Sequence, residues 1–387
     1  MNNLDKILIF SCIITPFTLL RLGFIGFGEI TLLILFLYGL RRGYLSLKLG
    51  ELIFSQFWSR FLVISIFGFM FNVLFLSHKT GTFEGMLFDF SAYIMVLISC
   101  MLIEGLIKKE RIHLFYILKN IFIFSGLSFV TLYFVSLYTN VLFGLPLKYH
   151  DFFAPLANNL HQTAMIMVPL IFLGLFVFEK EKHKLRKYFY LFIVISLSYV
   201  ALETGSFKAY IGVVFGWGVY LMLMFFNLFK GKLKNMVIAI TAFTLLLLSL
   251  SNWQQIEEKA IVIFQEEDIG EGRSSLYSNA LVVGLTSPIV GLGPGPHIFK
   301  GNKFWDSHET FLTVFIQSGI IGLLLLLVLV FRIFKKMTRE PALLAAVLPI
   351  FIYLLGGDIM RRLPVWLLLL FIYYYVELHS NNKLIKE

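Results

Sequence analysis

The sequence predicts an all-α protein that crosses a membrane many times. Of its 387 residues, 58% are hydrophobic and only 14% are charged, whereas soluble domains average about 45–50% apolar and about 25% charged residues. The apolar residues gather in runs close to the roughly 20 residues that a helix needs to span the hydrocarbon core. Because a bilayer offers no water to bind free backbone groups, these runs must be helical.

Twelve such runs can be distinguished, and they predict about 12 transmembrane helices in a single integral membrane domain, residues 1–387. Little polar sequence separates most of them, so no soluble domain is expected. The exception is one large loop, residues 251–307, between the ninth and tenth runs. The predicted spans are roughly 5–21, 24–40, 58–77, 86–107, 112–139, 162–178, 188–204, 206–229, 235–250, 309–331, 341–357 and 364–379.

Basic residues predict the orientation. Most of the 33 Lys and Arg residues lie in alternate loops and at both ends of the chain. The positive-inside rule therefore places both termini in the cytoplasm and the 251–307 loop on the outer side. This bias accounts for the net charge of +10, so the charge does not indicate nucleic-acid binding. Cys12 and Cys100 lie in apolar runs and predict neither a disulfide nor a metal site.

The 251–307 loop contains the most polar sequence outside the predicted helices. It is acidic overall, so a particular cation would have to hold an anionic ligand there, and Arg273 is its only arginine. The glycines of Gly291-Leu292-Gly293-Pro294-Gly295 predict a tight loop whose backbone amides are able to face an anion.

His308 stands where the tenth span begins, beside Glu309. A neutral imidazole there is able to accept a proton from a sugar hydroxyl, although a histidine at a membrane boundary more often contacts lipid headgroups. The segment lacks the second histidine of a zinc-protease helix, and no metal site is predicted.

Other polar residues lie beside spans on the same predicted side. Arginine binds phosphate oxygens in bidentate fashion and stays charged, yet an arginine at a span end also reaches lipid headgroups. The amide and imidazole groups near residue 160 suit either a cap of the sixth span or a contact to substrate. The candidates for substrate binding are Asn159, His161, Ser206, Lys208, Glu309, Arg361 and Arg362.

Read together, four segments resemble the O-antigen ligase and O-antigen polymerase superfamily. Their order, their spacing and the helix that follows the last of them carry the resemblance, which extends over roughly residues 155–380. The segments are Gly205-Ser206-Phe207-Lys208-Ala209, Gly272-Arg273-Ser274-Ser275-Leu276-Tyr277, Ser287-Pro288-Ile289-Val290-Gly291-Leu292-Gly293, and Ser307-His308-Glu309 continuing through Gly319-Ile320-Ile321-Gly322.

The resemblance implies a fold similar to the all-helical membrane glycosyltransferases of the GT-C type. It implies transfer of a glycan from undecaprenyl diphosphate to an acceptor hydroxyl, such as that of lipid A–core, at the periplasmic face of the bacterial inner membrane. Neither a metal nor a cofactor is expected. His308 would deprotonate the acceptor, and Arg273, Lys208, Arg361 and Arg362 would stabilise the departing diphosphate.

Two departures from the family pattern stand out. The family often has Ser-Arg where this chain has Ser206-Phe207, with Lys208 one position later. It also often has Asn after the loop histidine, where this chain has Glu309.

Three functions remain open from the sequence. One dominant outer loop favours a ligase, because polymerases often carry two large outer loops rich in arginine, and residues 140–161 contain Lys148 as their one cation. A repeat-unit polymerase is the alternative. A transporter of an anionic or lipid-linked solute would instead show paired interrupted helices around a site at the membrane midplane.

Overall fold

The computed structural model describes residues 3–23, 25–45, 52–76, 83–227, 273–300, 303–338 and 340–384. This part of the chain is mostly helical, as predicted, with four small antiparallel hairpins. The helices are α1 (Asn3–Ile14), α2 (Phe27–Arg41), α3 (Ile53–Phe71), α4 (Phe83–Lys108), α5 (Leu114–Ser136), α6 (Leu160–Lys180), α7 (Lys184–Leu202), α8 (Phe207–Asn227), α11 (Arg273–Gly284), α12 (Thr310–Met337), α13 (Pro341–Gly356) and α14 (Leu363–Leu384).

The hairpins join short strands at the ends of the helices. They are β1 (Arg21–Leu22) with β2 (Ile25–Gly26), β3 (Val141–Leu142) with β4 (Leu145–Pro146), β5 (Lys148–Tyr149) with β6 (Phe152–Phe153), and β7 (Ile298–Lys300) with β8 (Lys303–Trp305).

Most helices overlap the predicted spans, and several are long enough to cross a membrane. Seven described helices are both apolar and at least 18 residues long, namely α3 with its π-helical extension Asn72–Leu76, α4, α5, α6, α7, α8 and α12. Helix α13 and the apolar part of α14, Leu363–His379, are shorter. The predicted run 235–250 and residues 251–272 of the long loop lie outside the described residues. The protein is therefore a multi-pass membrane protein, and the predicted total of twelve spans stays a prediction.

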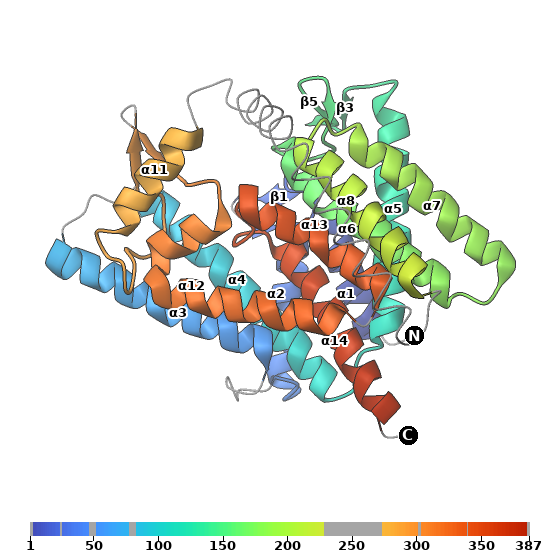
Figure 1. Ribbon diagram of the computed structural model, residues 1–387, viewed down its shortest axis with the longest axis horizontal. Helices are drawn as coiled ribbons and strands as arrows, with labels where there is room; N and C mark the ends of the chain where they lie inside the picture. Colours follow the sequence, from blue (N-terminus) through green and yellow to red (C-terminus); the bar gives the residue numbers. More distant parts are fainter. Residues whose placement is uncertain are drawn as a thin grey trace.

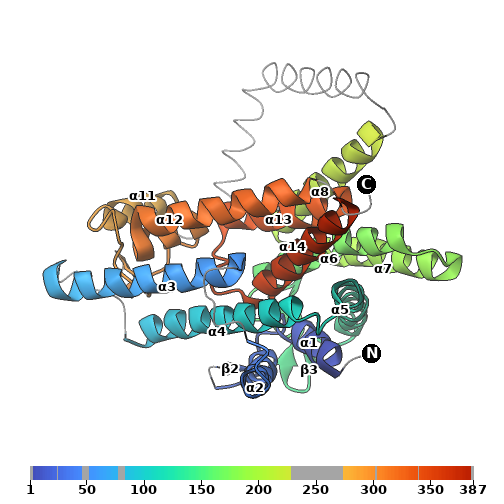
Figure 2. The same ribbon diagram turned by 90° about the horizontal axis from the view of Figure 1, so that it is seen from below.

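The centre of the bundle is α6, whose most apolar 18-residue window is 83% buried. It packs against α5, α7, α8 and α13. Figures 1 and 2 show α12 running beside α3, with α4 on the other side of α3. Between α3, α4 and α14, the rings of Trp58, Tyr93 and Trp366 form a buried aromatic cluster, with 4.9 Å between the two indole centroids. This packing fixes α14, and with it the loop that precedes α14.

The connecting loops lie at two ends of the bundle. Contacts between loops place together the same loops that the distribution of basic residues predicts to share a side of the membrane. At one end, Lys180 pairs with Glu340 at 3.3 Å and Lys119 pairs with Glu181 at 3.1 Å. At the other end, the β6 strand meets the end of α7 through a hydrogen bond from the Phe153 N–H to a backbone carbonyl. The second end is the predicted outer one, and it is called the outer end below.

Glu104 is buried within the bundle, and its partners are backbone amides and a hydroxyl. Its carboxylate accepts hydrogen bonds from the N–H groups of Phe54 and Ser55, both at 3.0 Å, and from the Tyr374 hydroxyl at 2.6 Å. The carboxylate therefore satisfies free amides at the start of α3. A structural role accounts for this buried acid.

Helix α12 is interrupted at Gly319, where φ is 63° and ψ is −164°. The 287–293 segment fills the interruption. Its Leu292 and Gly293 N–H groups donate to the carbonyls of Ile316 and Gln317 at 2.8 and 3.1 Å. In return, the Ile320 N–H donates to the Pro288 carbonyl at 2.8 Å. Backbone groups freed by the break are thus satisfied by protein, as a membrane interior requires.

Candidate functional site

Several helix ends converge at the outer end, around the loop 357–362 that joins α13 to α14. The Thr310 hydroxyl, in the first turn of α12, donates to the Gly357 carbonyl at 2.5 Å and accepts from the Ile359 N–H at 3.2 Å. Lys208, in the first turn of α8, lies against Gly356, because a Cβ built on that glycine would lie 2.7 Å from the lysine Cε. The loop therefore brings the starts of α8, α12 and α14 together.

His308 is exposed and precedes α12 with an unusual backbone conformation. Its φ is +55°, a left-handed value that costs a residue with a Cβ about 1–2 kcal/mol. The neighbouring residues hold this turn. Ser307 is buried, and its hydroxyl lies 2.7 Å from that of Thr313 and donates to the Glu309 carbonyl at 3.0 Å. Strained backbone of this kind is common where function requires a fixed side chain.

Glu309 caps α12. Its carboxylate accepts hydrogen bonds from the N–H groups of Phe311 at 3.1 Å and Leu312 at 2.6 Å. Burial raises the pKa of this carboxyl, and the two amide hydrogen bonds only partly oppose the rise. Asparagine is an equally good N-cap, so the Glu for Asn departure preserves the cap.

Arg361 binds three carboxylates. Its terminal nitrogens lie 2.8 Å from Asp89 and 2.8 Å from Asp306, and its Nε lies 3.2 Å from Asp358. Burial alone would lower its pKa, but the carboxylates of Asp89, Asp358 and Asp306 outweigh burial, so the pKa is raised. The predicted diphosphate ligand Arg361 is therefore already surrounded by negative charge.

Asp89 extends this cluster into α4 and α12. It is 1% exposed, and its second oxygen accepts from the Gly295 N–H at 3.2 Å and from the Gln317 side chain at 2.9 Å. The Tyr93 hydroxyl completes the chain by donating to Gln317 at 2.6 Å.

The amides of the glycine-rich segment are occupied by the protein itself. Gly291 donates to the Ser287 carbonyl, Gly293 donates to the Gln317 carbonyl, and Gly295 donates to Asp89. The predicted tight loop is confirmed by three positive φ values. The prediction that these amides face a bound anion is wrong, because the broken helix α12 and a carboxylate of α4 bind them.

Arg362 has different surroundings from Arg361. With the Gln162 amide oriented to satisfy both of its neighbours, its oxygen accepts from the two terminal nitrogens of Arg362 at 3.0 and 3.2 Å, and its nitrogen donates to the Thr18 hydroxyl. The Nε of Arg362 is buried without a hydrogen-bond partner. Burial, followed by the charge of Arg361, lowers the pKa of Arg362 to about 10. The guanidinium is therefore still protonated at neutral pH, and among the described residues no carboxylate pairs with it.

The starts of α6 and α8 meet beside Gln162. His161 Nδ1 lies 2.9 Å from the Ser206 hydroxyl, which is fully buried. The side chain of Asn159 accepts from the His161 N–H at 2.8 Å and caps α6. Asn159 thus has the capping role that the sequence left open, whereas His161 and Ser206 form a polar pair.

Arg273 begins α11, and its side chain lies outside the described residues. Helix α11 packs on the outer part of α12, since a Cβ on Gly284 would lie 2.6 Å from the Phe315 ring. The structure thus gathers Ser206, Lys208, His308, Glu309 and the two loop arginines at one end, and it brings the start of α11 beside the same helix.

Residues 191–327 match the family model described as O-antigen ligase. This segment, about a third of the chain, is similar to the O-antigen ligase family. The match confirms the resemblance predicted from the motifs and indicates an enzyme of the O-antigen ligase or polymerase type, acting on a lipid-linked glycan and a glycan acceptor. A comparison with curated proteins and one with solved structures each found no match.

Most of the predicted site lies within the O-antigen ligase segment. The segment includes α8, α11 and the first part of α12, and with them Ser206, Lys208, Arg273, His308 and Glu309. The residues that complete the outer end, such as Arg361, Arg362 and His161, come from outside the match and are joined to it by the contacts described above.

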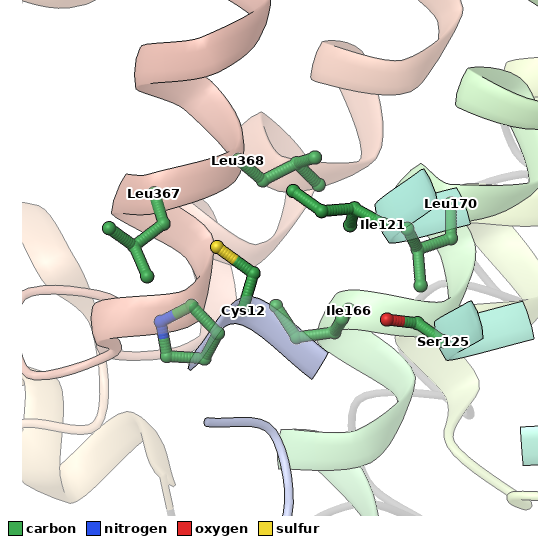
Figure 3. A pocket seen from close by; sticks show the side chains of 8 residues that line it. Cys12, Ile121, Ser125, Ile166, Leu170, Leu367 and Leu368 are labelled. Atoms are coloured by element: carbon green, nitrogen blue, oxygen red, sulfur yellow. The ribbon is translucent and has the colours of Figure 1, made fainter. Parts of the chain in front are cut away.

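One small pocket lies within the O-antigen ligase segment, and another lies apart from it, between α1, α5, α6 and α14. The first is partly open to solvent and is lined by His297, Asp306, Ser307 and Gln317 among others. The other pocket is also small, and its lining is mostly apolar (Figure 3). Its lining includes Cys12, Ile121, Ser125, Ile166, Leu170 and Pro364, the last of which is two residues beyond Arg362. None of the site residues predicted from the sequence lines either pocket.

The sequence did not identify Asp89 and Gln317 as members of the site. Both are polar residues within long apolar helices, where such residues are rare and usually functional or paired. That signal was present in the sequence. The partners themselves were not predictable, because Asp89 and Arg361 are 272 positions apart.

Proposed function

We propose that the protein is an O-antigen ligase-type glycosyltransferase that moves a glycan from undecaprenyl diphosphate to the hydroxyl of an acceptor such as lipid A–core. The reaction takes place at the periplasmic face of the inner membrane, with both termini in the cytoplasm. One observation supports this most strongly. A partly exposed cation, Arg362, pairs with no carboxylate of the described residues, and it shares an end of the bundle with the exposed imidazole of His308.

The donor diphosphate binds at Arg362 in this proposal. Gln162 is its one hydrogen-bonding side chain among the described residues and carries no charge, so no carboxylate occupies the hydrogen-bonding directions of the guanidinium that an anion would use. Lys208 adds a second cation from the start of α8, where it is 9% exposed. Arg273 is proposed as a third, because it begins the helix that packs on α12.

The chemistry divides between these cations and His308. The acceptor oxygen forms a bond to the anomeric carbon as the bond from that carbon to the diphosphate oxygen breaks. The acceptor proton goes to His308, and the electron pair of the broken bond leaves with the diphosphate, where Arg362 and Lys208 stabilise the growing charge. Attack opposite the leaving group inverts the anomeric centre. Fixed cations thus supply the stabilisation that a metal supplies elsewhere, so the proposal needs no metal or cofactor.

A pair of arginine variants tests the diphosphate site. Arg362→Gln removes the partly exposed cation of the proposed donor site, and Arg21→Gln removes an exposed cation from β1 at the same end. Because hydrogen bonds to charged groups contribute about 1.5–3 kcal/mol, we expect Arg362→Gln to lower kcat/KM for a lipid diphosphate-linked glycan about 10–100-fold. Arg21→Gln should stay within about twofold of the wild type. Equal effects of the two variants would remove Arg362 from the donor site.

A gel of surface polysaccharide from a deletion strain distinguishes ligase from polymerase. Loss of all long chains, with accumulation of lipid-linked polymer, identifies the ligase. A single repeat unit on the core identifies the polymerase alternative. Long chains of wild-type length and amount would exclude both.

A further inference from the structure

We propose that Asp89, Arg361 and Asp306 form a positioning bridge that holds His308 in its reactive place, and that Arg361 does not bind the diphosphate. This inference rests on the proposed function, in which His308 is the base. It assigns roles to two aspartates that the motifs of the family do not include, and it gives Arg361 a role different from the one predicted from the sequence.

The first argument is the strain at His308. Its left-handed backbone is unfavourable for a histidine, so the turn persists only if both of its sides are held. Downstream, Glu309 caps α12 and Ser307 contacts Thr313. Upstream, the 2.8 Å ion pair between Asp306 and Arg361 holds the chain two residues before His308.

The second argument is the rigidity of the bridge. Both terminal nitrogens and the Nε of Arg361 face carboxylates, and the planar fork of a guanidinium fixes the directions of these contacts. Asp89 is itself fixed, because the Gly295 N–H and the Gln317 side chain bind its other oxygen. The bridge therefore fixes Asp306 relative to α4, which carries Asp89, and relative to the first part of α12, which carries Gln317.

The third argument is charge. Three carboxylates bind the one guanidinium at Arg361, so its charge is compensated and its hydrogen-bonding groups are occupied by protein. Arg362 next to it faces an uncharged glutamine. The two adjacent arginines thus have different roles. Arg361 holds Asp306 in place, and Arg362 is available to bind the substrate.

The first test is kinetic. Asp306→Asn and Arg361→Lys should each lower kcat about 10-fold or more while the donor KM stays within about twofold, because substrate contacts are unchanged and the base is displaced. Asp5→Asn is the matched control. It breaks another buried aspartate pair, the 3.0 Å contact with His113, and should leave kcat within about twofold. A rise in KM with unchanged kcat would overturn the proposal, since it would mark a substrate contact.

The second test separates positioning from general damage. His308→Gly should lose activity and regain part of it with added imidazole, which needs no covalent positioning. In that background, Asp306→Asn should cause no further loss, so the rescued rates of the single and double variants should agree. A rescued rate that falls 10-fold in the double variant would show that Asp306 acts on something other than His308.

A third measurement does not depend on catalysis. His308→Cys introduces an exposed thiol, whereas the native Cys12 and Cys100 are buried. Adding Asp306→Asn should change the rate of labelling of this thiol by a membrane-impermeant maleimide at least threefold, and adding Asp5→Asn should not. Unchanged labelling with Asp306→Asn would refute the bridge. Wild-type activity of His308→Gly would instead show that His308 is not the base. The labelling result would then still test whether Asp306 and Arg361 hold the position of residue 308.

Discussion

The break in α12 allows a sharp test of how the outer end is built. Gly319 has a backbone conformation that is essentially restricted to glycine, and a Cβ placed there would lie 2.2 Å from the carbonyl carbon and oxygen of Ile289. Those atoms are backbone, so they cannot move aside as a flexible side chain would. Gly319→Ala must therefore displace the 287–293 segment from α12.

The magnitude follows from what is displaced. Forcing alanine into this conformation costs about 1–3 kcal/mol. Three backbone hydrogen bonds across the break are weakened, those donated by Leu292, Gly293 and Ile320, at about 1 kcal/mol each. Together these give a loss of about 4–6 kcal/mol in the free energy of unfolding, which for a chain of 387 residues corresponds to a drop in Tm of roughly 5–7 °C.

The assay is thermal unfolding of the purified protein in detergent, followed by size-exclusion chromatography with fluorescence detection. Gly218→Ala is the matched control, because Gly218 lies in α8 with no atom within 4 Å of a built Cβ. That change should leave Tm unaltered or raise it, since alanine is favoured over glycine in a helix by about 1 kcal/mol. A Tm for Gly319→Ala within 2 °C of the wild type would refute the account of a break filled by protein.

Two further predictions concern single carboxylates. Glu309→Asn should preserve the cap of α12, whereas Glu309→Ala should lower the free energy of unfolding by about 1 kcal/mol, and equal stabilities of the two variants in chemical denaturation would contradict the capping role. The backbone N–H of His183, followed by Lys119, lowers the pKa of Glu181 to about 2. Because this folded-state pKa lies below the unfolded value of about 4.3, the stability that Glu181 contributes is present above that pH and is lost as the pH falls towards about 2. The difference in Tm between wild type and Glu181→Gln should therefore be constant above about pH 5 and should vanish near pH 2, and a difference independent of pH would exclude the effect.

The sequence predicted the arrangement of the bundle better than its contacts. Long apolar runs and the distribution of Lys and Arg predicted which loops share an end, because burial and charge act on whole segments. Ordered motifs predicted the family and the segment that contains Ser206, Lys208 and His308. These features depend on local sequence alone.

Contacts between distant segments were not predictable in the same way. Residues 309–331 read as one apolar run, so nothing in its hydropathy showed the break at Gly319. Adjacent Arg361 and Arg362 look alike in the sequence, yet they differ in the structure because Asp89 and Asp306 reach only one of them. Glu309 looked like a departure from a motif, and in the structure it caps α12, a role that asparagine is equally able to fill.

The carboxylate of Glu104 has a consequence for how the chain is made. Two of its hydrogen bonds come from the start of α3, which packs against α4. The third comes from Tyr374, 270 positions after Glu104 in the chain. During biogenesis α3 and α4 therefore enter the lipid before α14 is translated, and the Glu104 carboxylate lacks its third hydrogen bond until α14 packs beside them. A message truncated before that tyrosine codon should yield a chain that quality-control proteases recognise and degrade.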